Sequence, residues 1–502
     1  MEEEEEGSLS LLRGERLAPQ PREVAHYTSS IQHDVEIARE VVKINLAHVV
    51  MLAEQGILDR RTAALILKAL STAEPASLMD ESLEDVHMNL ERYVAEKAGE
   101  EASGWMHLAK SRNDQVAAAI RMKLRLKLIE AGLAAIALRR ALLEQCKLHV
   151  ETLMPGYTHL QRAQPLTLAH HLLAHHDALM RDTQRLKECY TRVNLSPMGA
   201  AALAATSFPV NRRRVAELLG FDGLVENTVD AASSRDFVLE TLAVASLAMN
   251  TLSRLAEEVV LWSTSEFGFL ELSDEYASTS SIMPQKKNPV VAEVARARAS
   301  RVYGDLLSAL SMLNSLPFSY NLDLQEVTPH LWNALDILTS TLRVMAGLIS
   351  SSSFNVERMA EALSDGFANA TELANLLVRK GLPFRAAHRV VGFLARRMVE
   401  QYRPLSSLKA LEVVEAAKEL LGQPLSLTDE EVRRVLNPRW AVEACTVEGG
   451  PSPSEVRRML ADRFKAAEED EGFFLQLRRR LEESDEDLLA SVKVIESNVE
   501  VA

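Results

Sequence analysis

The sequence predicts an all-α protein whose centre is a bundle of unusually long helices. Aromatic residues make up only 5% of the 502-residue chain, while Ala, Leu, Val, Glu and Arg dominate, and this balance favours helices over sheets. Few segments alternate apolar and polar residues as a strand does. Five long segments contain no strong helix breaker. The 47% hydrophobic and 25% charged content is ordinary for a soluble globular protein.

The first long helix is expected at residues 114–152, where Gly132 is the only weak point and Pro155 ends the segment. Such a helix spans roughly 60 Å at ~1.5 Å per residue. The other four long helices are expected at 165–193, 233–266, 289–316 and 329–350. Helices of this length form an elongated bundle, because they cannot each cover a compact sphere.

The apolar faces of two of these helices indicate extensive burial. In the fourth, apolar residues recur mostly at intervals of three and four: Val291, Val294, Val302, Leu306, Leu310 and Leu313. Segment 239–252 of the third is apolar nearly all round. A helix of that kind is buried on several sides, either in a helical core shared by several subunits or within one subunit.

Shorter helices are expected on both sides of the bundle. Those before it are predicted at 34–55, 60–71 and 83–98, and those after it at 356–364, 370–379, 385–402, 408–421 and 453–467. No repeat of fixed period is present. We therefore expect three domains: a helical head at 1–112, the long-helix bundle at 113–354 and a helical tail at 355–502.

Charge and cysteine content exclude several classes of function. The formal charge is -15 with no basic stripe, so a nucleic-acid partner is not expected. The acidic runs at 2–6 and 482–487 are typical of solvated segments. Cys146, Cys189 and Cys445 match no metal or redox spacing, which fits a reducing cytoplasm. The acidic start is no signal peptide, and no apolar run is long enough to span a membrane.

A serine-rich loop runs directly into the fourth long helix. Pro289 suits the first helical position and Asn288 the cap before it. The loop then ends at the positive end of a helix dipole, where an anion binds well. Ser280 or Ser281 is placed to act on a substrate whose carboxylate Lys286 holds. The alternative is a polar loop that only caps the helix.

A second polar loop lies between Pro155 and Pro165. His159 within it is a candidate acid or base, because histidine changes charge nearest neutral pH; the alternative is a hydrogen-bonded loop histidine. In the helix that follows, His171 and His175 have the i, i+4 spacing that can bind zinc. No carboxylate or thiolate of convincing spacing accompanies them, so packing or surface roles are expected.

The third informative segment precedes the first long helix. Arg112 can grip a carboxylate through two parallel hydrogen bonds. Asn113 or Asp114 suits the cap of the helix, and a capping role is compatible with a role in binding.

These three segments resemble the fumarase/aspartase superfamily, whose members release fumarate from succinyl compounds. The run Met-Pro-Gln-Lys-Lys-Asn-Pro at 283–289 is similar to the argininosuccinate lyase family in particular. Segment 156–165 resembles that family's histidine loop, and 107–115 its substrate-binding turn, usually written His-Thr-Gly-Arg-Ser-Arg-Asn-Asp. The similarity extends from about residue 29 to 454, with the motifs in the same order.

The resemblance implies a three-domain fold with a central bundle that forms a tetrameric helical core. It implies β-elimination of argininosuccinate to arginine and fumarate, the last step of arginine biosynthesis, in the cytoplasm. No metal or organic cofactor is expected. The expected partners are the substrate and three further copies of the chain, with each site built from motifs of different subunits.

The resemblance also implies catalytic roles. Ser280 is the candidate base, with its anion stabilised by Lys286 and the helix N-terminus. His159 is the candidate acid, and Glu293 would orient it. The opposite assignment, with His159 as base and Ser280 as donor, stays open.

Weaker similarities place substrate contacts along the rest of the chain. Segment 28–34 resembles the family's N-terminal substrate loop, 84–87 its acidic-histidine motif, 230–237 an anion contact, and 320–326 the segment that holds the amino-acid end. The expected substrate-binding residues are Ser30, Asp85, Arg112, Asn113, Thr158, Arg235, Asn288, Tyr320 and Gln325.

The chain departs from the family pattern at several positions. Relatives often have glycine at four positions where this chain has a residue with a side chain: Thr279, Ala109, Ala201 and Ala205. Replacing Gly by Ala stabilises a protein when the backbone geometry permits it. Lys110 replaces an arginine, which leaves the role of that position open, and Thr328 stands where several relatives contact substrate through lysine.

Two alternatives follow from these observations. One is another fumarate-releasing lyase, such as adenylosuccinate lyase or fumarase, although Gln285-Lys286-Lys287 and segment 111–114 favour argininosuccinate. The other is a structural protein that has lost activity, as delta-crystallin has, and the missing glycines keep this alternative open.

Overall fold

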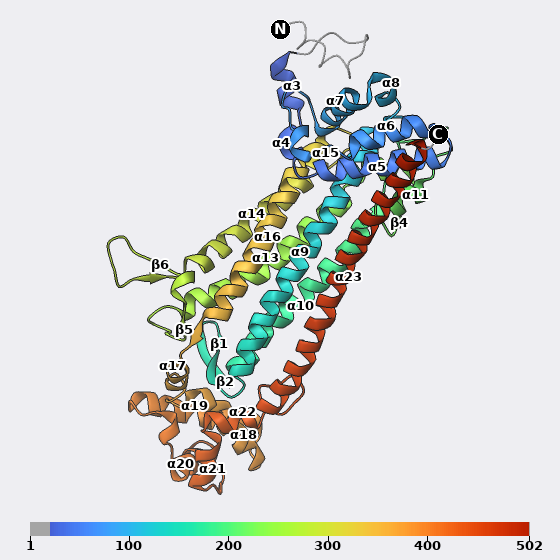
Figure 1. Ribbon diagram of the computed structural model, residues 1–502. Helices are drawn as coiled ribbons and strands as arrows, with labels where there is room; N and C mark the ends of the chain where they lie inside the picture. Colours follow the sequence, from blue (N-terminus) through green and yellow to red (C-terminus); the bar gives the residue numbers. More distant parts are fainter. Residues whose placement is uncertain (1–20, 501–502) are drawn as a thin grey trace.

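The computed structural model describes residues 21–500 and shows an elongated molecule built almost entirely of helices (Figure 1). Its long helices are α9 (Arg112–Leu148), α10 (Leu168–Val193), α13 (Asp236–Trp262), α14 (Val290–Leu313), α16 (Thr328–Ser351) and α23 (Pro453–Glu500). Their apolar faces form one continuous core with the head helices. The predicted all-α bundle is confirmed.

Helix α9 begins two residues before its predicted start because Ser111 caps it. The Ser111 hydroxyl accepts a hydrogen bond from the backbone of Asn113, and the Asp114 carboxylate accepts one from the backbone of Ser111 at 3.0 Å. The two residues form a capping box. Asp114 thus acts from inside the helix, and the suggestion that Asn113 or Asp114 is the cap residue is wrong.

The start of α14 also differs from the prediction. Pro289 occupies the cap position without a side-chain hydrogen bond, and the first helical residue is Val290. Asn288 lies in a short strand, so its expected role as the cap is wrong. Lys287 and Asn288 are drawn into the strand by pairing with Thr279 and Ser278.

The C-terminal helix is much longer than predicted. The sequence indicated a helix at 453–467, whereas α23 has 48 residues and runs back along the bundle toward the head (Figure 1). Phe474, Leu477 and Leu488 are buried in the central core. Dense Glu and Arg residues on its other faces obscured this stripe. The domain boundaries stay a prediction, but α23 packs with the bundle and not with the tail.

Short helices form the two ends of the molecule. The head contains α3 (Arg22–Thr28), α4 (Ile31–Asp34), α5 (Ala38–Glu54), α6 (Arg60–Leu70), η1 (Pro75–Leu78), α7 (Val86–Ala98) and α8 (Glu100–Ser103). The tail contains α17 (Val356–Glu361), η3 (Phe367–Asn369), α18 (Ala370–Arg379), α19 (Phe384–Glu400), η4 (Leu405–Ser407), α20 (Ala410–Leu421), α21 (Asp429–Val435) and α22 (Pro438–Glu443). Helices α18 to α21 bury a separate apolar cluster. The acidic run at 2–6 lies outside the described residues.

The remaining elements are short and lie between the long helices. The helices are α11 (Arg212–Leu218), α12 (Thr228–Ser233), η2 (Asp274–Tyr276) and α15 (Asp323–Glu326). The strand pairs are β1 (Leu153–Thr158) with β2 (Gln161–Thr167), β3 (Leu195–Ser196) with β4 (Gly223–Leu224), β5 (Leu270–Glu271) with β8 (Ser353–Phe354), and β6 (Ser278–Thr279) with β7 (Lys287–Asn288). The β3–β4 pair is parallel and the others are antiparallel.

One described helix, Asp323–Ser351, is long and apolar enough to cross a membrane by length and composition alone. It is not an uninterrupted apolar run, because Asp336 and Arg343 lie within it. Just over half of the most apolar 18-residue stretch of this helix is buried in the protein. Leu331, Leu335 and Leu338 lie in the central core. We interpret it as a core helix of the bundle.

Candidate active site

The first group of predicted site residues lies at the head end of the bundle. The Ser30 hydroxyl donates a hydrogen bond to the Asp34 carboxylate at 2.9 Å, and the same carboxylate oxygen accepts from the backbone N–H of Val86 at 3.0 Å. The Gln325 amide donates to the carbonyl of Thr28 at 3.2 Å. Residues far apart in sequence are thus joined around the N-terminal loop.

Asp85 and Arg112 form an ion pair in the same region. Arg112 Nη1 lies 2.7 Å from Asp85 Oδ2. The other Asp85 oxygen accepts a hydrogen bond from the backbone N–H of Met88 at 2.7 Å and so caps α7. Arg112 is therefore held from one side by a carboxylate that is itself fixed by a helix terminus.

Several buried side-chain nitrogens at the head have no hydrogen-bond partner among the described residues. They are Nη2 of Arg112, Nε and Nη2 of Arg235, and both ring nitrogens of His87. Arg235 is only 3% exposed and interacts electrostatically with Tyr320. Two guanidinium groups with unused donors suit a bound carboxylate.

Burial sets the electrostatics of this end of the bundle. It raises the pKa of Asp34 to about 7 and lowers the pKa of His87 to about 4. It also lowers the pKa of Arg235 to about 10, which still leaves the group charged at neutral pH. The negative charge of a bound carboxylate would compensate for the cost of burying the Arg235 guanidinium group.

Asn113 and Lys110 have structural contacts close by. The Asn113 amide donates to the carbonyl of Ala202 at 3.0 Å. Lys110 is buried, burial lowers its pKa to about 8, and its ammonium group donates to the side-chain oxygen of Asn45. Lys110 therefore supports the head rather than offering a free cation.

His159 lies at the tip of the β1–β2 hairpin and not in an irregular loop. Thr158 pairs with Gln161, so His159 and Leu160 form a two-residue connection. Both have φ of 56°, a left-handed conformation that usually requires Gly or Asn. Neither position carries Gly or Asn, so no local residue signals this turn. Thr158 and His159 are exposed, so the imidazole is open to solvent in the single chain.

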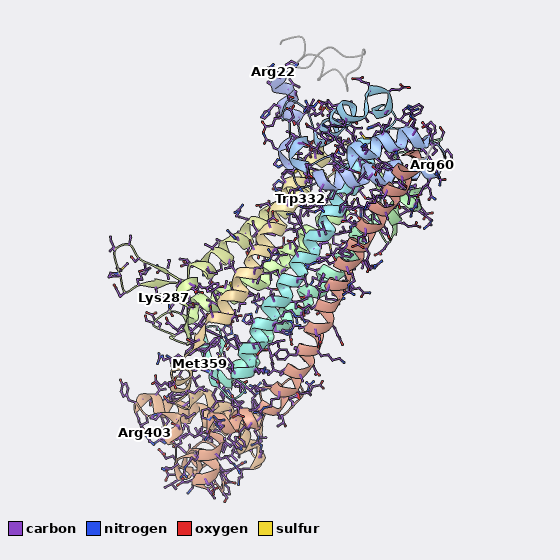
Figure 2. The ribbon with its side chains drawn as sticks, in the orientation of Figure 1. Arg22, Arg60, Lys287, Trp332, Met359 and Arg403 are labelled. Carbon is purple, nitrogen blue, oxygen red and sulfur yellow. The ribbon has the colours of Figure 1, made fainter. Side chains whose placement is uncertain are left out.

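Ser280 lies at the base of a hairpin loop that extends from the bundle beyond Lys287 (Figure 2). Its hydroxyl oxygen accepts hydrogen bonds from the backbone N–H groups of Ile282 at 3.2 Å and Met283 at 3.1 Å. The side chain of Ile282 is 85% exposed. The loop thus presents an apolar tip and a serine oxygen held by two amides.

The other catalytic candidates near this loop are open to solvent. Lys286 and Glu293 are exposed, and Asn288 is half-buried. No hydrogen bond or ion pair joins Glu293 to His159 within residues 21–500. The proposed orienting role of Glu293 therefore has no counterpart inside one chain.

The predicted site residues fall into three separate places on the molecule. The head carries Ser30, Asp85, Arg112, Asn113, Arg235, Tyr320 and Gln325; the β1–β2 hairpin carries Thr158 and His159; the β6–β7 loop and the start of α14 carry Ser280, Lys286, Asn288 and Glu293. Figure 1 shows the head and the β1–β2 hairpin at opposite ends of the bundle. One chain does not bring the three groups together.

The positions where glycine was expected divide into two kinds. Ala109, Ala201 and Ala205 have φ of 62°, 51° and 59°. Alanine is strained there, so the backbone geometry that a stabilising replacement of glycine requires is not present at these three positions. Thr279 instead lies in β6, opposite Lys287, where a β-branched residue fits.

Sequence reasoning missed the carboxylate that accompanies His171 and His175. Glu258 of α13 reaches both imidazoles, at 2.6 and 2.8 Å. It is more than eighty residues away in sequence, so no local spacing signals the contact.

Comparison with known proteins agrees with this architecture. Residues 14–304 match the family described as Lyase, and residues 367–443 match the family described as Argininosuccinate lyase C-terminal. The chain is similar to the crystal structure of EDDS lyase in complex with formate, with a TM-score of 0.87, 33% identity and 92% of each chain covered. It also shares its fold with class II fumarase from Schistosoma mansoni, at a TM-score of 0.69 and 16% identity, over 81% of this chain and 90% of that one. The protein is a lyase with the fumarase/aspartase fold.

Curated relatives narrow the class further. The argininosuccinate lyase of Methanothrix thermoacetophila is 46% identical over 96% of this chain and 98% of its own length. The argininosuccinate lyase of Methanocaldococcus jannaschii is 42% identical, over 90% and 93% respectively. The chain belongs to the argininosuccinate lyase family.

Proposed function

We infer that the protein is an argininosuccinate lyase that releases fumarate and arginine by β-elimination. Relatives named argininosuccinate lyase match this chain over nearly their whole length. The Argininosuccinate lyase C-terminal family matches the tail. None of these findings favours another lyase or an inactive structural protein. Cytoplasmic activity in arginine biosynthesis is part of the proposal.

The arrangement around Ser280 is the observation that carries the chemistry. Elimination requires a base that removes a proton from the carbon beside a carboxylate. A serine hydroxyl is a poor base near neutral pH unless its anion is stabilised. The two backbone N–H groups that already point at Ser280 Oγ would stabilise that anion, and Lys286 in the same loop would add a positive charge.

The remaining roles follow from the chemistry of the other two groups. Arg112 and Arg235 would bind substrate carboxylates through their unused donors. His159 would protonate the departing guanidino nitrogen. The two carboxylates of the succinyl half leave with fumarate, and the arginine half, which keeps the third carboxylate, would be held near Tyr320 and Gln325. The reverse assignment of base and acid to His159 and Ser280 is distinguished by the experiments below.

The proposed active unit is a homotetramer whose sites combine residues of different chains. Separation of the three groups in one chain supports it. A second support is apolar surface on the bundle: Leu247, Val294, Leu307, Leu310 and Val344 are each more than 40% exposed. Val294 and Val344 line one groove, and exposed apolar residues gathered in this way are typical of an interface.

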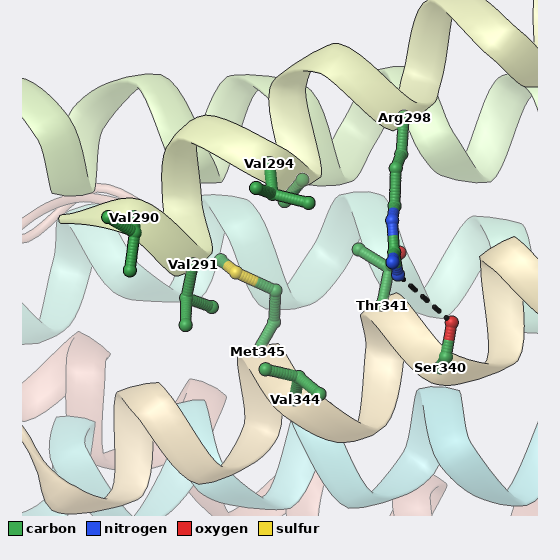
Figure 3. Close-up of a pocket in the computed structure, with 9 residues that line it drawn as sticks. Val290, Val291, Val294, Arg298, Ser340, Thr341, Val344 and Met345 are labelled. Carbon is green, nitrogen blue, oxygen red and sulfur yellow. Dashed lines mark hydrogen bonds between the residues drawn. The ribbon is translucent and has the colours of Figure 1, made fainter. Parts of the chain in front are cut away.

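The groove between α14 and α16 belongs to this surface. Figure 3 shows Val290, Val291 and Val294 on α14 facing Val344 and Met345 on α16, around a hollow of about 270 Å³. The groove starts where the Ser280 loop enters α14. A neighbouring subunit seated on it would meet the catalytic loop as well.

The direct test is to incubate the purified protein with argininosuccinate and to measure fumarate and arginine, with adenylosuccinate as the control. Equal release of fumarate from both, or from neither, contradicts the proposal. Ser280→Ala should lose turnover and keep substrate binding, whereas His159→Asn should keep proton exchange at the substrate carbon if His159 is the acid.

Sharing of sites is tested by mixing these two inactive variants after mild dissociation. Mixed tetramers contain some sites with both intact residues, so activity should return if Ser280 and His159 come from different chains. If the mixture is no more active than either variant alone, the sites are not shared between chains. A fully active monomer in a dilution series contradicts the tetramer.

A further inference from the structure

His171, His175 and Glu258 form a compact cluster between α10 and α13 that includes none of the residues assigned to the reaction. The Nε2 atoms of the two histidines lie 2.6 and 2.8 Å from the same oxygen, Glu258 Oε2. The i, i+4 spacing places both imidazoles on one face of α10. The three ligand atoms all lie within 4.8 Å of one another.

The charge of Glu258 has no basic partner from lysine or arginine among the described residues. Its neighbour Glu257 pairs with Arg296, but Glu258 contacts only the two histidines. The side chains of His171, His175 and Glu258 are 24%, 11% and 31% exposed. A half-buried carboxylate between two imidazoles is therefore a place that a cation would stabilise.

The donor set selects the class of cation. Two imidazoles and one carboxylate suit zinc and similar first-row metals, whereas calcium and magnesium prefer oxygen ligands. Zinc holds such ligands at about 2.0–2.2 Å, so tetrahedral ligand atoms lie roughly 3.4 Å apart. The two observed separations between imidazole nitrogen and carboxylate oxygen, 2.6 and 2.8 Å, are shorter than that spacing by less than about 1 Å.

The surroundings resemble the apolar shell that stabilises metal sites. The ring of Trp262 lies 5.1 Å from that of His171, and Trp262 packs in turn against Phe269 and Phe354. Phe269 also contacts Tyr157 of the β1–β2 hairpin. An ion bound here would tie the first turns of α10 to α13, close to the base of the hairpin that carries His159.

We propose that His171, His175 and Glu258 bind one divalent metal ion of the zinc class, with water in the fourth position, as a clamp between α10 and α13. This proposal is independent of the proposed activity and reverses the expectation that the sequence carries no metal site. The alternative is a metal-free pair of hydrogen bonds from the two imidazoles to the carboxylate.

The test uses the full-length protein, first stripped of metal with a chelator. Cobalt(II) is titrated in as a probe, and its visible absorption and bound stoichiometry are measured; zinc is then added in competition. We expect one cobalt per chain with a tetrahedral spectrum, its displacement by zinc, and a higher melting temperature with either ion.

Glu258→Gln and His175→Gln should each weaken binding at least about tenfold and abolish the rise in melting temperature. The matched control is His170→Gln, a histidine on the same helix but outside the cluster, which should bind as the parent protein does. A parent protein with no saturable cobalt signal, or a signal unchanged in both cluster variants, overturns the proposal.

Discussion

Arg112 Nη1 lies 2.7 Å from Asp85 Oδ2, so the first residue of α9 is fixed to the residue that caps α7. The ion pair leaves Arg112 Nη2 buried and without a partner. Its planar group is therefore oriented before a ligand arrives, with one donor still free. Such preorganisation lowers the entropic cost of binding a carboxylate.

Arg112→Lys should lower kcat/KM on the order of a hundredfold. Lysine keeps the charge but cannot pair with Asp85 and donate to a substrate in the same plane, and a hydrogen bond to a charged group contributes about 1.5–3 kcal/mol. Steady-state kinetics measure the effect. Arg92→Lys is the control, because Arg92 pairs with Asp80 at the surface of the head. A similar loss in both variants contradicts a role specific to Arg112.

Asp34 should make stability fall as pH rises. Burial raises its pKa to about 7 in the folded protein, against 3.8 for an ordinary aspartate. Between these values the folded state holds a proton that the unfolded chain has lost. The free energy of unfolding therefore decreases from about pH 4 to about pH 7, at up to ~1.4 kcal/mol per pH unit. Asp114, whose pKa is raised to about 6, acts in the same direction.

Asp34→Asn removes this titration and keeps an oxygen that can accept from Val86. Melting temperatures measured between pH 4 and 8 should therefore decline less steeply in the variant than in the parent. The exposed Glu81→Gln is the control and should leave the slope unchanged. Parallel curves for the parent and Asp34→Asn contradict the prediction.

The long helices could be predicted from the sequence because their signals are local. Absence of breakers and apolar spacing located α9, α10, α13, α14 and α16 to within a few residues. The length of α23 could not be predicted this way, since its apolar stripe is sparse and is stabilised by distant α9. Likewise, no local pattern signals that His159 and Leu160 adopt positive φ, because the paired strands of the hairpin impose that conformation.

The motifs of the candidate site could be predicted from the sequence, but their positions relative to one another in the fold could not. The segments around Arg112, His159 and Ser280 are recognisable in the sequence, and the structure separates them over the length of the bundle. Glu258 shows the opposite case. It belongs to no motif, and only the packing of α13 against α10 brings it to His171 and His175.

Ala201→Gly and Ala205→Gly should each raise the free energy of unfolding by about 1 kcal/mol. Both alanines have positive φ, where the left-handed conformation costs an L-residue about 1–2 kcal/mol and glycine nothing. Part of this gain is offset by the greater freedom of glycine in the unfolded chain. Chemical denaturation measures the change. Ala137→Gly, at an exposed position inside α9, is the control and should be destabilising by about 1 kcal/mol. Destabilisation in all three variants contradicts the strain argument.

Gly132→Ala should destabilise the bundle even though alanine is the better helix former. A Cβ at Gly132 of α9 would lie 2.3 Å from the ring of Phe474 on α23, far inside contact distance. Phe474 is fully buried, so its ring cannot move aside without disturbing the core. The overpacking should cost about 1–3 kcal/mol, more than the roughly 1 kcal/mol gained in helix propensity. Gly472→Ala is the matched control on α23: a Cβ there meets nothing within 4 Å, so the same substitution should be stabilising. Denaturant unfolding of both variants measures the difference, and a gain in stability for Gly132→Ala would show that α23 does not pack on α9 as closely as this contact requires.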